Sequence, residues 1–174
     1  TNRLSSAGLG CIKSTVSALK VHFLQSGKLS MMSMGLLKAG MYRPKPLQDG
    51  VVPVLPNYTI TRELEINPSH CEQYNAMVNW KLGIASVIHP NYLQVLTLPM
   101  QLDMMVNRPF PFKPMGLVHL ANHIDINFLP EQNSKLLLTT AFAGLSWHKK
   151  GWVFAVLSEG KVDQELAISG TSYY

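Results

Sequence analysis

The sequence predicts an α+β domain in which an antiparallel sheet wraps around one long apolar helix. Residues 91–106, NYLQVLTLPMQLDMMV, are apolar on nearly every helical face, which is typical of a buried central helix. From residue 116 onward, four segments alternate between apolar and polar residues and are separated by short turns. That pattern is typical of antiparallel strands. A single helix followed by such a meander favours the α+β class.

The length and composition fit one globular domain. A chain of 174 residues that is 47% hydrophobic and 14% charged is large enough to bury its own core. The chain has no initiator methionine and stops inside a predicted strand, so we expect a piece of a longer polypeptide. Cys11 and Cys71 are too few for a disulfide framework and lack metal-ligand spacing, which indicates a reducing compartment, and we expect the cytoplasm. No run of about 18 uncharged apolar residues occurs, so no membrane-spanning helix is expected.

The positive charge is concentrated at the N-terminal end. Residues 1–48 carry seven basic residues and no acid, whereas the rest of the chain carries eight basic and ten acidic residues, a balance of −2. We therefore divide the chain into a basic helical lead-in, residues 1–48, and a folded domain, residues 49–174. The basic residues suit a solvated helix face, contact with an anionic cofactor or lipid surface, or a targeting segment. They are not interleaved with aromatic residues, so nucleic-acid binding is not expected.

The elements before the central helix follow in order. Residues 12–24 place apolar residues on one helical face, and residues 29–42 form a second, Met- and Leu-rich helix that ends before two prolines. Methionine at this density favours a core-filling role for the second helix. Residues 43–57 contain four prolines and form an extended linker, and residues 58–66 alternate like a strand.

The next helix begins at Asn67. Asparagine is a favoured N-cap, and Pro68 occupies the first helical position, where its missing N–H costs nothing. We expect a break near Gly83 and a new element at Pro90. Pro99 lies within the central helix and should kink it or begin its regular part.

Four strands complete the predicted domain. After a proline-rich loop, residues 107–116, the strands are expected at 116–129, 135–148, 151–161 and 164–174, with turns at 130–131, 149–151 and 159–160. A sheet of this kind wrapped around a central helix is the hotdog fold, and it is the fold class that we predict.

Metal, nucleotide and serine chemistry find little support. His119, His123 and Asp125 share one face of the strand predicted at 116–129, but the two histidines would be about 13 Å apart, too far for one ion. Gly144 to His148 lacks the second glycine of a nucleophile elbow, and no phosphate-binding glycine motif occurs. We therefore expect no metal and no cofactor. His119 follows directly after the proline-rich loop, where it either faces a ligand or serves as a hydrogen-bonded structural residue.

Residues 89–124 resemble the N-terminal hotdog repeat of MaoC-like acyl dehydratases and R-specific enoyl-CoA hydratases. A Pro-x-Tyr start, an apolar helix with an internal proline, a Phe-Pro-Phe loop and Gly-Leu-Val-His occur here in the order found in that family. The basic turn at 148–151 and the closing SGTSYY are also similar. The matching residues are Pro90, Tyr92, Pro99, Phe110, Pro111, Phe112, Gly116, Leu117, Val118 and His119.

This resemblance implies the first of two hotdog repeats, with the second absent from this chain. In such proteins an Asp and a His in the second repeat act as an acid/base pair on an acyl thioester, and the first repeat shapes the acyl site. Here, Asn67-Pro68-Ser69-His70 is close to that signature, but Glu65 stands where the Asp is needed and lies in a predicted strand. No catalytic residue is therefore assigned. The resemblance implies substrate contacts at Tyr92, Met100, Phe110, Phe112 and His119.

The leading hypothesis is an acyl-thioester-binding, non-catalytic hotdog domain. A lyase activity, as an acyl (de)hydratase, is expected only if the domain is joined to a catalytic second repeat. The expected partners are an acyl-CoA or acyl-carrier-protein thioester and a second hotdog domain or a second copy of the chain. Two alternatives stay open. One is a non-enzymatic hotdog subunit that binds acyl groups or pairs with another hotdog chain, and the other is a stand-alone thioesterase-like enzyme.

Overall fold

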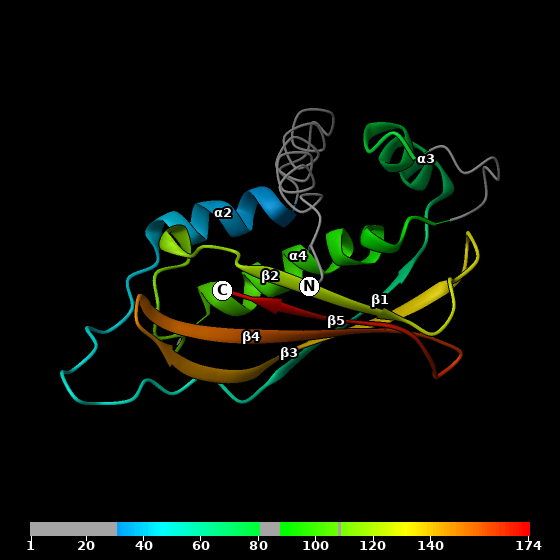
Figure 1. Cartoon of the computed structure of the whole chain (residues 1–174). Coiled ribbons are helices and arrows are strands. Elements are labelled where there is room, and N and C mark those ends of the chain that lie inside the picture. The colour runs from blue at the N-terminus through cyan, green and yellow to red at the C-terminus, as the bar shows by residue number, and fades with distance from the viewer. Residues whose placement is uncertain (1–30, 81–87, 108) are drawn as a thin grey trace, which may run out of the picture.

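The computed structural model describes residues 31–80, 88–107 and 109–174. They form a five-stranded antiparallel sheet with the order β1-β3-β4-β5-β2, and the helices lie on one face of it (Figure 1). The helix predicted at 12–24 and the break near Gly83 lie outside the described residues. The elements are α2 (Met31–Met41), β1 (Thr59–Glu65), α3 (Pro68–Met77), α4 (Pro90–Val106), the 3-10 turn η1 (Pro114–Gly116), β2 (Ala121–Ile126), β3 (Lys135–His148), β4 (Gly151–Val162) and β5 (Glu165–Tyr173).

The predicted fold class is confirmed: α4 is the long central helix, and the sheet curves beneath it (Figure 1). The N-terminal helix α2 packs across α4. A Cβ atom at Gly35 would lie 2.8 Å from Cδ2 of Leu102, so glycine at this position lets the two helices approach closely. Pro99 lies inside α4.

Two buried clusters hold the layers together. The first, which we call the aliphatic cluster, lies where α3 and the start of α4 meet the sheet, and it includes Ile66, Cys71, Tyr74, Ile88, Tyr92, Met100, Leu136, Leu138 and Ile168. The second, the aromatic cluster, joins the segment after α2, the Phe-Pro-Phe loop and the strands β3 and β4. Its buried members are Tyr42, Met105, Phe110, Phe154 and Val156, and Leu55, Phe112, Leu117, Phe142, Leu145 and Tyr174 pack against them.

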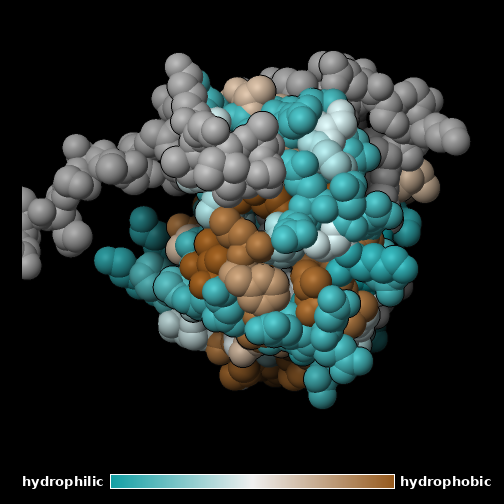
Figure 2. Space-filling view, turned by 90° about the vertical axis from the view of Figure 1, so that its right-hand side faces the viewer, coloured by the Kyte–Doolittle hydropathy of each residue, from teal (hydrophilic) through white to brown (hydrophobic). Residues whose placement is uncertain are grey.

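The surface at the α3 end differs from this interior. Seen from that end, the molecule is mainly hydrophilic, with an apolar patch near the middle of the view (Figure 2). Within the described ranges, none of the helices combines the length and the hydropathy needed to cross a bilayer.

Three local predictions were wrong. Methionine-rich α2 does not fill the core along its length, because Met34, Leu37 and Met41 are exposed. The strand expected at 116–129 is confined to Ala121–Ile126, since the proline-rich loop continues as η1 and an extended segment. The last turn lies at Asp163 and Gln164, not at 159–160.

The position of that last turn has a physical reason. Asp163 and Gln164 have φ values of 49° and 70°, the pair of positive angles that a two-residue hairpin turn requires. Gly160 is instead inside β4, where a Cβ atom would lie 3.1 Å from Cγ2 of Ile168 and 3.3 Å from Cδ1 of Leu136. Its glycine serves close packing beneath α4 and does not mark a turn.

Candidate functional site

The space between α4 and the sheet is occupied by a hydrogen-bonded network of neutral side chains centred on Gln101. Gln101 is 1% exposed. Its amide nitrogen donates to the hydroxyl oxygens of Thr97 at 3.2 Å, Ser158 at 3.2 Å and Ser172 at 3.4 Å. The hydroxyl of Tyr174 donates to Oε1 of Gln101 at 2.5 Å. The central helix is therefore joined to β4 and β5 by polar contacts at its middle.

The network extends from the core to the edge of the sheet. Ser172 accepts a hydrogen bond from Nε2 of Gln94 at 2.8 Å and donates to Oδ1 of Asn122, on β2, at 3.1 Å. Ser158 and Thr140 share a further hydrogen bond at 3.2 Å. Because each of these buried groups has a partner, the network does not carry the penalty of an unsatisfied polar atom.

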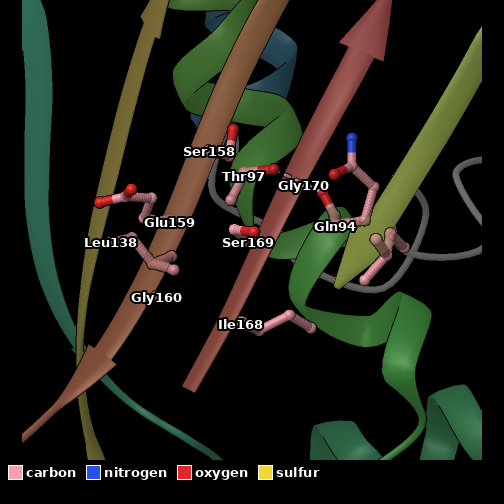
Figure 3. A pocket seen from close by; sticks show the side chains of 10 residues that line it. Gln94, Thr97, Leu138, Ser158, Glu159, Gly160, Ile168, Ser169 and Gly170 are labelled. Atoms are coloured by element: carbon pink, nitrogen blue, oxygen red, sulfur yellow. Dashed lines mark hydrogen bonds between the residues drawn. The ribbon is translucent and has the colours of Figure 1, made fainter. Parts of the chain in front are cut away.

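A small pocket adjoins this network. Gln94 and Thr97 of α4 face residues of β4 and β5 across it, among them Ser158, Gly160 and Gly170 (Figure 3). A Cβ atom at Gly170 would lie 3.3 Å from Oε1 of Gln94, so the glycines give the pocket its room. Its free space is about 20 Å³, enough for a single water molecule and far too little for an acyl chain.

The groups in this region are poorly suited to acid/base catalysis. Burial raises the pKa of Tyr174 to about 12, although a hydrogen bond with Ser172 opposes the shift. A general acid or base works best with a pKa near the working pH. Glu159 lies at the pocket, but strand alternation turns it to the side of β4 opposite Ser158 and Gly160, where its carboxylate is 3.6 Å from Nζ of Lys161 (Figure 3).

The predicted substrate-contact residues do not converge on one cavity. Tyr92 and Met100 are buried in the aliphatic cluster. Phe110 is buried in the aromatic cluster, with Phe112 packed against it at a ring distance of 5.6 Å. His119 is exposed on the extended segment before β2. The assignment of these five residues to substrate binding stays a prediction.

His119 lies at the surface of the aromatic cluster. Its ring stacks on Tyr174 at a centroid distance of 4.9 Å, and Tyr174 in turn stacks on Phe154 at 5.4 Å. The residue as a whole is exposed, but its imidazole is crowded by these neighbours. The resulting loss of water lowers the pKa of His119, and a hydrogen bond with the backbone of Ala121 acts in the opposite direction. A neutral imidazole at this position can accept a hydrogen bond from a ligand.

The stretch that resembles the acid/base signature forms a helix start. Asn67 is the N-cap of α3, and its Oδ1 accepts a hydrogen bond from the backbone N–H of His70 at 3.2 Å. Glu65 is the last residue of β1, exposed and paired in register with Lys135 of β3. The predicted capping role of Asn67 and the strand position of Glu65 are both confirmed.

His123 and Asp125 form an exposed pair on β2. Nε2 of His123 lies 3.2 Å from Oδ1 of Asp125, and the two side chains are 71% and 67% exposed. Solvent screens such a pair strongly, so it adds little stability. In the parts of the chain that the structure describes, no three His, Cys, Asp or Glu side chains are grouped so that they could hold a metal ion.

Comparison with known sequences finds a relative among the acyl-thioester dehydratases. No protein-family model matches the chain. Over 120 residues, the chain is 34% identical to 3-hydroxyacyl-thioester dehydratase X of Mycobacterium tuberculosis. The aligned stretch covers 65% of this chain and 40% of the relative. The predicted resemblance to MaoC-like dehydratases is confirmed. The chain thus spans less than half the length of this relative.

Three solved structures share the fold. The crystal structure of HtdX from M. tuberculosis matches with a TM-score of 0.61 and 23% identity, over 67% of this chain and 49% of that chain. The HadBC (3R)-hydroxyacyl-ACP dehydratase complex from the same organism matches with a TM-score of 0.57 and 12% identity, over 70% of this chain and 96% of that chain. The ChsH1–ChsH2 complex, also from M. tuberculosis, matches with a TM-score of 0.53 and 11% identity, over 66% of this chain and 80% of that chain.

Sequence reasoning missed the polar network. Thr97 and Gln101 are four residues apart, so they share a helix face, but a polar pair on an apolar helix is usually read as its solvent side. The alternating small polar residues Ser158 and Ser172 on two predicted strands were the available signal. Pairing them with Thr97 and Gln101 would have required the register between helix and sheet.

Proposed function

We propose that the chain is an acyl-thioester-binding, non-catalytic hotdog domain of a 3-hydroxyacyl-thioester dehydratase or enoyl-CoA hydratase of the MaoC type. The neutral network between α4 and the sheet is the observation that carries this proposal. It places amides and hydroxyls, and no carboxylate–histidine pair, at the middle of the central helix. Such groups can hold a fold in register but are poorly suited to general acid–base catalysis near neutral pH. The dehydratase relative supports the reaction class.

The proposed partner is a second hotdog domain or a second copy of the chain, docked along β2. The strand order places β2 at an edge of the sheet, so one side of its backbone faces no other strand among the described residues. Apolar side chains beside this edge, Val118, Leu120 and Ile126, are exposed. An open apolar edge is a template for pairing with another strand. The solved HadBC and ChsH1–ChsH2 structures are complexes of two different chains, which supports pairing of this kind.

We place the acyl thioester at the surface formed by Phe112 and His119. These two of the five predicted contact residues reach the surface, and Phe110 supports them from within the aromatic cluster, whereas Tyr92 and Met100 lie in the separate aliphatic cluster. The lowered pKa of His119 favours a neutral ring that can take part in a hydrogen bond with a thioester or pantetheine amide. The acyl donor is expected to be an acyl-CoA or an acyl-carrier protein.

A non-enzymatic subunit is the alternative function. It would bind acyl groups or pair with a separate catalytic hotdog chain, and the same edge of β2 would serve it. The reading frame beyond Tyr174 separates the two: an Asp-x-Asn-x-x-His segment within the next domain length, about 100–150 residues, favours the two-repeat enzyme. A cytoplasmic location stays a prediction.

Hydration of crotonyl-CoA tests the proposal. We expect no turnover by the 174-residue chain alone, binding of crotonyl-CoA that weakens on His119→Ala, and turnover by the product of the complete reading frame. His123→Ala is the matched control, because it removes an exposed histidine from the same region without altering the aromatic cluster.

Two results would contradict the proposal. Robust turnover by the chain alone that is abolished by His70→Ala would make α3 the active site. Failure of both the chain and the complete product to bind crotonyl-CoA or a crotonylated carrier protein would remove the acyl-thioester function.

A further inference from the structure

The tip of the β3–β4 hairpin, residues 147–152, carries a pair of indole rings, one exposed and one half-buried, next to two lysines. Trp147 and Trp152 are directly opposite each other in the register of the two strands. Their ring centroids are 5.1 Å apart at an angle of 71°, and Trp147 is 65% exposed. The turn between them consists of the exposed residues His148, Lys149 and Lys150 followed by Gly151.

The indole pair continues an apolar face beyond the core. Residues two apart on a strand share a face, so Trp147 lies on the same side as Leu145, which packs into the aromatic cluster. The ring of Trp147 thus extends the apolar face of the hairpin to a point where the core no longer covers it. An edge-to-face ring contact with Trp152 holds it in place.

Other exposed apolar residues gather at the same end of the molecule. The end of α2, the linker after it, η1 and the hairpin tip lie together opposite α3 (Figure 1). Tyr42, directly before the linker, and Leu55, within it, pack into the same aromatic cluster as Leu145. The exposed apolar residues on these segments are Met41, Leu47, Val51, Val52, Val54 and Met115.

The charge at this end is positive. No acidic residue occurs between Glu131 and Glu159, a stretch that contains the whole tip. Exposed cations also lie on the neighbouring segments, at Arg43, Lys45 and Lys113, against one acid, Asp49. An exposed apolar surface rimmed by cations is complementary to a partner surface that has an anionic outer layer over an apolar interior.

We propose that this end of the molecule docks on the surface of an anionic lipid bilayer. Trp147 would enter the headgroup layer, where an amphipathic indole is favoured, and Lys149 and Lys150 would contact the lipid phosphates. A second copy of the chain is a poor occupant, since a two-fold contact through the tip would bring the lysines of both copies together. This inference rests on the hairpin tip and is independent of the acyl-binding proposal.

Vesicle co-sedimentation tests the docking surface. The protein is expected to bind phosphatidylcholine–phosphatidylserine vesicles, to bind pure phosphatidylcholine vesicles weakly, and to be released by salt. A lysine close to an anionic membrane contributes about fivefold to partitioning, so Lys149→Glu combined with Lys150→Glu should lower it by at least about 25-fold. Trp147→Ala should also weaken binding and should remove a lipid-induced blue shift of the tryptophan emission.

Lys135→Glu is the matched control, because Lys135 is an exposed lysine at the opposite end of β3. It is expected to leave most of the binding intact. Circular dichroism verifies that each variant is folded. The proposal is overturned if the wild-type protein binds neither kind of vesicle, if it binds both equally well, or if Lys135→Glu weakens binding as much as the tip variants. Tip-dependent binding of free coenzyme A without any binding to vesicles would also overturn it, and would assign the tip to a nucleotide.

Discussion

The α3 end and the hairpin end of the domain are held together by different interactions. At the α3 end, two helices begin with a side-chain cap followed by proline: Asn67 caps α3 and His89 caps α4. At the hairpin end, the rings of Phe110, Phe142 and Phe154 contact one another at 5.4 to 5.9 Å. At the α3 end, hydrogen bonds at two helix starts, one of them made by a titratable histidine, add to the packing of the aliphatic cluster. The hairpin end depends on the packing of these aromatic rings against one another.

This difference separates the expected roles of the two ends. The aromatic cluster supports two features: the surface at Phe112 and His119, which we assign to the acyl thioester, and the hairpin tip. A rigid cluster keeps both features in place. The caps at the α3 end fix where α3 and α4 begin, and thereby set how α4 lies over the sheet. Gln101 lies between the ends and joins α4 to the sheet by hydrogen bonds.

The largest effect is expected from Phe154→Ala. Phe154 is 1% exposed and contacts the rings of Phe110, Phe112, Phe142 and Tyr174. Its loss should lower the free energy of unfolding by about 3–5 kcal/mol, measured by urea denaturation. Phe154→Leu, which keeps much of the volume, should cost less than the alanine variant. Equal losses in both variants would show that ring geometry matters more than volume, and a loss below about 1 kcal/mol in Phe154→Ala would refute the rigid cluster.

Gln101→Met is expected to have an intermediate effect. Methionine preserves the length and removes the amide, so the buried hydroxyl of Tyr174 loses its acceptor. A buried polar group without a partner costs about 1–3 kcal/mol. Gln94→Met is the comparison on the same helix, because Gln94 also donates to Ser172 but is partly exposed, so water can compensate for its loss. If the two variants lose the same stability, the network at the centre of α4 is not what joins the helix to the sheet.

The sequence contained enough information for the α3 end and the outline of the sheet, but not for the network or the last turn. Asn67-Pro68 is a local capping signal, and the apolar run of α4 exceeds what a surface helix carries, so both could be predicted without tertiary contacts. Gly160 was taken for a turn because glycine serves both turns and close packing. Only the position of Ile168 beneath it decides between the two. The burial of Gln101 depends in the same way on which strands lie beneath α4.

The smallest effect concerns pH and compares the two caps directly. Nδ1 of His89 accepts the backbone N–H of Asn91 at 3.0 Å, and only a neutral imidazole can do so. Burial between Tyr74 and Trp80 lowers the pKa of His89 below its usual 6.5. The unfolded chain therefore binds more protons than the folded chain between the lowered pKa and 6.5. In this window the free energy of unfolding should rise with pH, and the full contribution of His89 should be present above 6.5.

His89→Asn replaces the titrating cap with the residue that caps α3. It should flatten this pH dependence while keeping the helix start, since loss of an N-cap costs only about 1 kcal/mol and asparagine preserves the acceptor. Urea denaturation between pH 5 and pH 8 measures the effect. His119→Asn is the control at the other end, where the lowered pKa belongs to an exposed residue and should contribute less. If His119→Asn flattens the profile and His89→Asn does not, the titrating element belongs to the hairpin end, and the contrast drawn between the two ends is wrong.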